Sequence, residues 1–145
     1  MNVLTSSERE TEQLGRELAA QLTADDVVYL EGELGAGKTC LVRGIAEGLG
    51  AMPRQVASPT FAILNEYADS RGRIVLRHLD LYRLKDDPKD LEVLGLPDSL
   101  AGAPVAIEWP AQTIRRLLPP TVEVVIEPAA DGKRRFKVSD SGARP

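Results

Sequence analysis

The sequence predicts an α/β domain in which helices flank a mixed β-sheet. Helical and extended patterns alternate along the first part of the chain, which is typical of this fold class. Two pairs of neighbouring extended segments predict hairpins, so the sheet should not be strictly doubly wound and all parallel. The composition, 43% hydrophobic and 28% charged over 145 residues, fits one globular unit. We expect a single domain over residues 1–140 and a flexible tail at 141–145.

The first part of the chain predicts a helix, a buried strand and a second helix. Ser7 and Glu10 have the spacing of a capping box, and the leucines every four residues after them predict a helix over 8–22. The apolar run at 27–30 is typical of a buried strand. Apolar residues at helical spacing predict the second helix, which should end near the glycines within 48–50.

The rest of the chain predicts two hairpins, one isolated strand and two short helices. One short helix should begin at Asp87, with Pro88 at the first helical position, and another should lie within 110–119. Extended segments are expected at 61–67, 74–82, 104–109, 121–128 and 134–140. The first two of these segments should form one hairpin, and the last two should form the other.

The charge disfavours direct, strong binding of bare nucleic acid without excluding it, and the cysteine count excludes two kinds of site. The formal net charge is -4, whereas a chain that binds bare nucleic acid on its own usually carries a basic surface. Cys40 is the single cysteine, which excludes a disulfide framework and a zinc site built on cysteines. The N-terminus has no signal-peptide pattern, and no apolar run is long enough to span a membrane. We expect a cytoplasmic protein that uses no membrane.

A glycine-rich stretch joins the predicted strand at 27–30 to the helix after it. Residues 32–39, GELGAGKT, match the pattern G-x-x-x-x-G-K-[ST] in full. Glycines let the backbone curl so that successive N–H groups point at phosphate oxygens, and the following helix adds its positive N-terminus. We therefore predict a single-domain P-loop NTPase fold.

Individual positions of this stretch have expected parts in nucleotide binding. Lys38 should reach the β- and γ-phosphates, and the Thr39 hydroxyl should be a ligand of Mg²⁺. The remaining predicted contacts come from the loop and the first turn of the helix, and they are Gly32, Leu34, Gly35, Ala36, Gly37 and Cys40.

A nucleotide site of this kind needs a carboxylate near the metal, at the carboxyl end of a strand beside the glycine-rich stretch. Glu108 ends the apolar run at 105–107, which suits a central strand. Asp80 ends the alternating segment at 74–79. Either carboxylate could bind Mg²⁺, directly or through water, and the other could orient the attacking water.

Three more residues are candidates for the site. Thr60, in the stretch SPTF, could belong to a loop that responds to the γ-phosphate, although a plain turn into a strand has the same pattern. Trp109, the only tryptophan, could cover the phosphates or belong to the core. His78, the only histidine, is more often a packed strand residue than a base.

Several segments, taken together, resemble one family. The stretches GELGAGKT, SPTFAILNEY, RHLDLYRL, DPKDLEVLGL and IEWP occur in this order and spacing. In this combination they are similar to the bacterial TsaE family, also called YjeE, which are small P-loop ATPases needed to make threonylcarbamoyladenosine beside the anticodon of tRNAs. The resemblance runs from SERETEQLGRELA near the N-terminus through IEWPAQ, and the last hairpin is only generally similar.

The resemblance implies catalytic and metal-binding roles. Lys38 and Thr39 keep the phosphate and Mg²⁺ roles given above. Glu108 is similar to the family's second metal ligand, and Asp80 to its essential Walker-B-like aspartate. Thr60 corresponds to a residue of the family's switch-like loop. The cofactors implied are ATP and Mg²⁺.

The resemblance also implies neighbours of the nucleotide that the residue pattern alone would not suggest. Glu8 and Thr11 match the N-terminal segment that borders the base in the family, and Trp109 matches a residue close to the nucleotide. Cys40 stands where a second threonine is frequent in the family. Thr39 already supplies the hydroxyl for Mg²⁺, so the expected chemistry is unchanged.

Partners are implied by the family as well. TsaE-like proteins act on a complex of TsaD, which transfers the threonylcarbamoyl group, and its inactive paralogue TsaB. The resemblance therefore implies a Mg-dependent ATPase, slow alone, that resets a TsaB–TsaD complex, transfers no group itself and meets tRNA only indirectly. The alternatives are a nucleotide-binding switch without turnover and a small-molecule P-loop kinase, for which the only arginine-bearing lid candidate, at 113–118, is short.

Overall fold

The computed structural model of the protein describes residues 1–33, 35, 37–52, 64–81, 100–110 and 112–140. The helices and strands within them are β1 (Asn2–Thr5), α1 (Glu8–Ala19), β2 (Val27–Glu31), α2 (Lys38–Gly48), β3 (Leu64–Ala68), β4 (Ile74–Asp80), β5 (Val105–Glu108), α4 (Gln112–Leu117), β6 (Val122–Pro128), the 3₁₀ turn η3 (Ala130–Gly132) and β7 (Arg134–Asp140). The predicted short helix at Asp87 and the tail at 141–145 lie outside the described residues. None of the described helices is long and apolar enough to cross a membrane.

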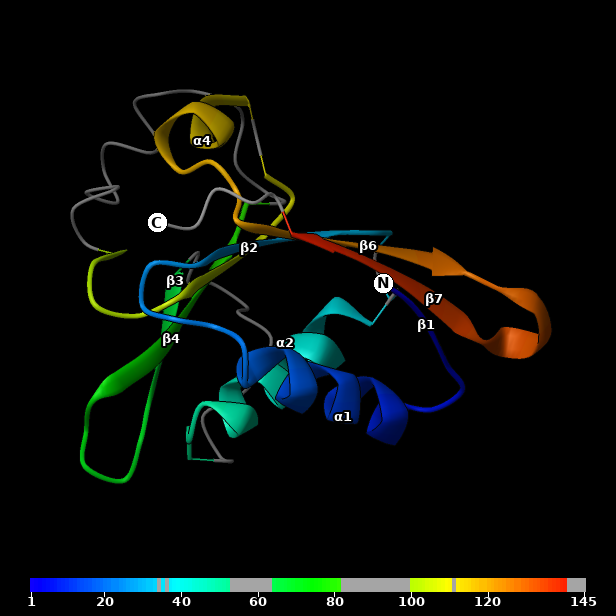
Figure 1. Cartoon of the computed structure of the whole chain (residues 1–145), viewed down its shortest axis with the longest axis horizontal. Helices are drawn as coiled ribbons and strands as arrows, with labels where there is room; N and C mark the ends of the chain where they lie inside the picture. Colours follow the sequence, from blue (N-terminus) through cyan, green and yellow to red (C-terminus); the bar gives the residue numbers. More distant parts are fainter. Residues whose placement is uncertain (34, 36, 53–63, 82–99, 111, 141–145) are drawn as a thin grey trace.

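The strands form one mixed sheet, as the sequence predicts. Among the described residues it has seven strands in the order β1-β7-β6-β2-β5-β4-β3 (Figure 1). The central strands β6, β2, β5 and β4 run parallel, whereas β7, β1 and β3 are antiparallel to their neighbours. Both predicted hairpins are present, as β3–β4 and β6–β7. The predicted α/β fold class is thereby confirmed.

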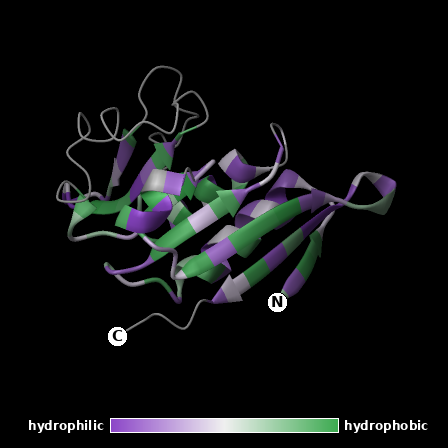
Figure 2. Ribbon diagram, turned by 90° about the horizontal axis from the view of Figure 1, so that it is seen from above, coloured by the Kyte–Doolittle hydropathy of each residue, from purple (hydrophilic) through white to green (hydrophobic). Residues whose placement is uncertain are grey.

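Helices cover both faces of the sheet, with α1 and α2 on one face and α4 on the other (Figure 1). The alternation of side chains along β2 explains why there are two cores. Val28 and Leu30 pack with α1 and α2, and Tyr29 packs in a second cluster with Ile107 and Ile114. Figure 2 shows hydrophobic and hydrophilic residues alternating along the long strands near the N-terminus. Because β2 is buried on both faces, it holds the start of the glycine-rich stretch in a fixed position.

The N-terminal strand β1 was not expected from the sequence. It pairs antiparallel with β7 in a register that places Thr5 opposite Arg134, and the Met1 ammonium donates to the Val138 carbonyl oxygen at 2.8 Å. Four residues are too few to show a period of two, and only Thr5 among them is buried. The pairing brings the start of α1 close to the β6–β7 turn.

Helix α1 begins where the sequence predicts and ends at Ala19 rather than at residue 22. The Ser7 hydroxyl caps the helix by accepting from the Glu10 backbone N–H at 3.1 Å. The Glu10 carboxylate reaches back to Ser6, where it accepts from the backbone N–H at 3.3 Å and from the hydroxyl at 2.5 Å. These bonds from Ser6 lower the pKa of Glu10, since they favour its ionised form.

Helices α1 and α2 pack closely, and a glycine permits the contact. A Cβ atom on Gly44 would stand 2.1 Å from the Glu12 carbonyl oxygen. Two ion pairs between the helices flank this approach, Arg16–Glu47 at 2.9 Å and Arg43–Glu12 at 3.0 Å. Because α2 directly follows the glycine-rich stretch, this packing fixes where the stretch ends.

We expect Gly44→Ala to destabilise the fold by about 2 kcal/mol, because the added methyl group forces α1 and α2 apart. The sign of the change in stability is informative, since at an ordinary helical position the same substitution stabilises a helix by about 1 kcal/mol. Urea denaturation followed by circular dichroism measures the difference in the free energy of unfolding. A variant as stable as the wild type would contradict the close approach of the two helices.

Candidate functional site

The glycine-rich stretch forms the turn between β2 and α2 that its motif predicts. Gly35 and Gly37 have φ values of +80° and +110°, in the left-handed region that favours glycine. Gly37 is the N-cap of α2, which begins at Lys38. The N-terminus of α2 therefore faces this turn, as an anion site requires. Three residues expected in the site lie outside the described residues: Leu34, Ala36 and Thr60.

Lys38, the first residue of α2, is buried close to the end of β2, and only 4% of its surface is exposed. Its ammonium group donates to the Gly32 carbonyl oxygen at 2.5 Å and lies 3.8 Å from the centre of the Trp109 ring. Burial lowers the pKa of Lys38, while the Glu108 and Asp80 carboxylates act in the opposite direction. A phosphate oxygen can replace the Gly32 carbonyl oxygen and the Trp109 ring as partners of the ammonium group.

Trp109, whose ring contacts Lys38, has a left-handed backbone. Its φ is +57°, a value that bulky residues rarely adopt. Such a conformation costs about 1–3 kcal/mol and is common at functional sites. Of the two interpretations open from the sequence, the structure favours Trp109 as a neighbour of the phosphate site, since the residue is only partly buried and its ring lies against Lys38.

The two predicted carboxylates stand on adjacent strands. In the parallel pairing of β4 with β5, Asp80 is opposite Glu108, and in the pairing of β2 with β5, Leu30 is opposite Glu108. The three strands therefore end at one edge of the sheet, where the glycine-rich turn begins. The carboxylates and the lysine that the sequence assigns to one site meet at this edge.

These residues line a cavity of about 440 Å³ at the carboxyl edge of the sheet. Its walls come from α1, the glycine-rich turn, the first turn of α2, the ends of β4 and β5, and the start of β7. The residues that line it are Glu8, Gly35, Gly37, Lys38, Thr39, Cys40, Asp80, Glu108, Trp109 and Arg134. All of them except Arg134 are residues that the sequence assigns to the site.

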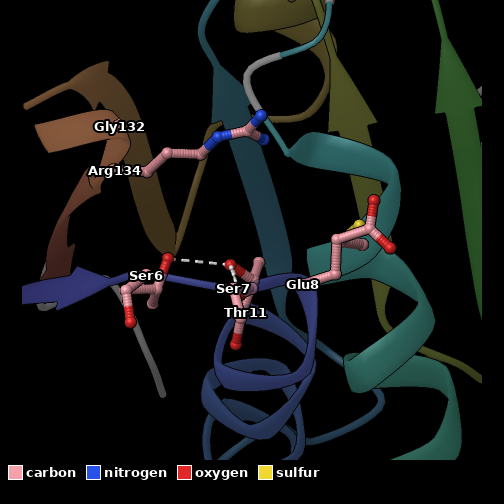
Figure 3. Close-up of a pocket in the computed structure, with 8 residues that line it drawn as sticks. Ser6, Ser7, Glu8, Thr11, Gly132 and Arg134 are labelled. Atoms are coloured by element: carbon pink, nitrogen blue, oxygen red, sulfur yellow. Dashed lines mark hydrogen bonds between the residues drawn. The ribbon is translucent and has the colours of Figure 1, made fainter.

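A smaller cavity of about 180 Å³ adjoins the first one at the start of α1. Glu8, Cys40 and Arg134 line both cavities. Figure 3 shows the first turn of α1 on one side of this cavity and Arg134 on the other. The buried Thr11 hydroxyl lies 2.8 Å from that of Thr5. Glu8 and Thr11, the two residues that the family resemblance places near the base, thus line the cavity that adjoins the one lined by Lys38.

Sequence reasoning missed Arg134, which follows the η3 turn. A Cβ atom on Gly37 would stand 2.7 Å from the Arg134 Nη1 atom, so the guanidinium lies against the glycine-rich turn (Figure 3). Its only signal in the sequence is the basic run at 133–135. The β6–β7 hairpin has to be folded before that run can be placed at the site.

Two other residues considered from the sequence lie outside the wall of the cavity. Arg115 of α4 is ion-paired with Glu31, and its guanidinium lies 4.9 Å from the centre of the Tyr29 ring. It therefore anchors α4 to β2 and is no lid over the phosphate site. His78 is a packed strand residue, as its spacing predicts, and its Nε2 atom lies 2.6 Å from a carboxylate oxygen of Glu108.

The oxygen donors of the larger cavity fit Mg²⁺ that arrives with a nucleotide. In the part of the chain that the structure describes, no three His, Cys, Asp or Glu side chains converge to hold a metal ion. Mg²⁺ is commonly bound by one or two carboxylates together with substrate phosphates and water. Thr39, Asp80 and Glu108 offer this partial set of ligands in one cavity.

Comparison with known proteins agrees with this geometry. The family model described as threonylcarbamoyl adenosine biosynthesis protein TsaE matches residues 5–136. The chain belongs to the TsaE family. The resemblance predicted from the sequence is thereby confirmed.

Individual TsaE-family proteins match almost the whole chain. The tRNA threonylcarbamoyladenosine biosynthesis protein TsaE of Bacillus subtilis is 41% identical over 142 residues, which cover 97% of this chain and 85% of the relative. The protein of the same name from Streptomyces coelicolor is 39% identical over 136 residues, 91% of each chain. The crystal structure of Bacillus subtilis YdiB has a TM-score of 0.72 and 30% identity, and covers 98% of this chain and 86% of that one.

We expect Arg134→Ala to weaken ATP binding by about tenfold or more, because a guanidinium makes charge-assisted hydrogen bonds worth about 1.5–3 kcal/mol. Isothermal titration measures the affinity. Arg135→Ala is the matched control, since Arg135 is the next residue of β7 and lines neither cavity. Equal losses of affinity in the two variants would mean that the effect comes only from the protein's overall charge. Wild-type affinity in Arg134→Ala would contradict the assignment of Arg134 to the site.

Proposed function

We propose that this TsaE-family protein is a Mg²⁺-dependent ATPase in the threonylcarbamoyladenosine modification of tRNA. The observation that carries the proposal is one cavity in which Lys38, Thr39, Asp80 and Glu108 meet at the carboxyl ends of the parallel central strands. Phosphoryl-transfer sites of P-loop proteins use this combination of groups. The names of the relatives, tRNA threonylcarbamoyladenosine biosynthesis proteins, support the pathway.

The phosphate end of ATP would lie along the glycine-rich turn and the N-terminus of α2. Lys38 would exchange its present partners for phosphate oxygens, and Arg134 would approach the same oxygens from β7. Thr39, Asp80 and Glu108 would hold Mg²⁺, directly or through water. Bound Mg²⁺ would neutralise charge on the β- and γ-phosphate oxygens.

The base would lie in the smaller cavity beside α1. Glu8 and Thr11 present oxygen atoms there, which can accept hydrogen bonds from the amino group of adenine. Arg134 lines both cavities and would mark the boundary between base and phosphates. Guanine has an amino group as well, so it is the family resemblance that leads us to assign ATP to the site.

Turnover should be slow in the absence of a partner. Among the described residues of the larger cavity, the groups able to orient a water are carboxylates, and two of these are expected at the metal. P-loop enzymes with such incomplete sites wait for a partner to complete them. The family indicates TsaD-like and TsaB-like proteins as partners, so the ATP cycle would reset their complex while that complex holds the tRNA.

A small-molecule P-loop kinase is the second candidate. Such a kinase usually closes an arginine-bearing lid over the phosphates, and the sequence candidate for this part was the segment 113–118, with Arg115 and Arg116. The guanidinium of Arg115 is instead engaged by Glu31 and lies 3.5 Å from Glu123. This engagement favours the ATPase.

Steady-state hydrolysis of Mg-ATP tests the proposal, measured with the protein alone and with a purified TsaB–TsaD pair. We expect slow turnover alone, clear stimulation by the pair, and a loss of roughly 100-fold or more in Lys38→Ala. Turnover that the pair leaves unchanged would contradict the partner-dependent mechanism and would favour a screen for small-molecule acceptors. Hydrolysis by Lys38→Ala at the wild-type rate would contradict the P-loop site itself.

A further inference from the structure

Glu108 has a buried partner on the neighbouring strand. The His78 Nε2 atom lies 2.6 Å from Oε2 of Glu108, and the two side chains are 1% and 6% exposed. The register of β4 and β5 makes this contact, since His78 is opposite Ala106 and Asp80 is opposite Glu108. The carboxylate that ends β5 is thus held from β4 by the residue two positions before Asp80.

A second hydrogen bond holds the imidazole from its other side. The Tyr67 hydroxyl lies 3.4 Å from Nδ1 of His78, and both side chains are buried. Burial raises the pKa of Tyr67, so the hydroxyl keeps its proton and can donate. We assign the Nε2–H group as the donor and the Glu108 carboxylate as the acceptor. An N–H of the imidazole thus points at Glu108.

His78 stands behind Glu108 as seen from the cavity. Glu108 lines the larger cavity, whereas His78 is not among the described residues that do. The hydrogen bond takes up Oε2 and leaves the other carboxylate oxygen for the cavity side. A carboxylate that binds a metal is commonly held in this way by a hydrogen bond from outside the ligand shell. In a core without such a task, an apolar residue would pack here at no cost in polar desolvation.

We propose that His78 is a positioning residue for the metal site, whose Nε2–H holds the Glu108 carboxylate in the orientation that binds Mg²⁺. The proposal rests on the proposed Mg²⁺-dependent function. It assigns His78 no proton transfer and no contact with the nucleotide. The expected consequence of losing the N–H is a weaker energetic coupling between Mg²⁺ and nucleotide, with metal-free nucleotide binding unchanged.

Isothermal titration of ADP, in Mg²⁺ and in EDTA, measures this coupling as the ratio of the two affinities. We expect His78→Leu to lower the ratio about tenfold and to leave the affinity in EDTA unchanged. His78→Gln should restore most of the ratio, because the glutamine Nε2 group can donate from a similar position. Thr121→Val is the control for a lost buried hydrogen bond, since the Thr121 hydroxyl bonds to Asp26 at the opposite end of β2.

Glu108→Ala gives the reference for removal of this carboxylate and separates the two proposals. If Glu108→Ala lowers the ratio and His78→Leu does not, the positioning role is overturned and the ATPase function stands. If Thr121→Val lowers the ratio as much as His78→Leu, the effect is general destabilisation and the positioning role is again overturned. A wild-type protein without any coupling would overturn both proposals.

The single histidine of the chain allows a second test that needs no variant. In protein labelled with ¹⁵N-histidine, the proposal predicts a proton on Nε2, the atom that faces Glu108. Addition of Mg²⁺ to the ADP-bound protein should shift the Nε2 resonance. An Nε2 atom without a proton, or an Nε2 resonance that stays unchanged in protein shown to bind Mg-ADP, would overturn the proposal.

Discussion

The buried ammonium group of Lys38 is the interaction on which the rest of the structure depends. A cation that is only 4% exposed needs compensating partners, and they come from separate segments: the Gly32 carbonyl oxygen, the Trp109 ring and the carboxylates of Asp80 and Glu108. These groups can meet only if β2, β5 and β4 are parallel, adjacent and level at their carboxyl ends. The two cores on either side of β2 hold that edge in place.

Left-handed backbone conformations gather at the same edge. Gly35, Gly37 and Trp109 all adopt them within the wall of the larger cavity. For the glycines this conformation is free of strain, whereas for Trp109 it persists only where the surroundings hold it. Here the close packing of α1 on α2 fixes one side of the turn, and the pairing of Arg115 with Glu31 fixes the end of β2 that leads into it. A site already shaped in this way can bind phosphate with little rearrangement.

Local patterns predicted the parts of the site that lie within one element or one turn. The glycine-rich turn, the strand that ends in Glu108 and both hairpins follow from short patterns of glycine, apolar and polar residues. Contacts between distant segments were not predictable in this way, and they include β1 on β7, Arg134 against Gly37, and His78 with Glu108. A short apolar run, a basic run and a lone histidine do not indicate which distant segment they contact.

Trp109 fluorescence gives the most direct test of the central claim, that Lys38 holds the phosphate chain. Trp109 is the only tryptophan, and its ring lies against the ammonium group that phosphate should draw away. The account predicts a saturable change in emission on titration with Mg-ATP and almost none with adenosine, which has no phosphates. An emission that responds equally to both, or that ATP leaves unchanged although Lys38→Met alters it, would contradict the claim.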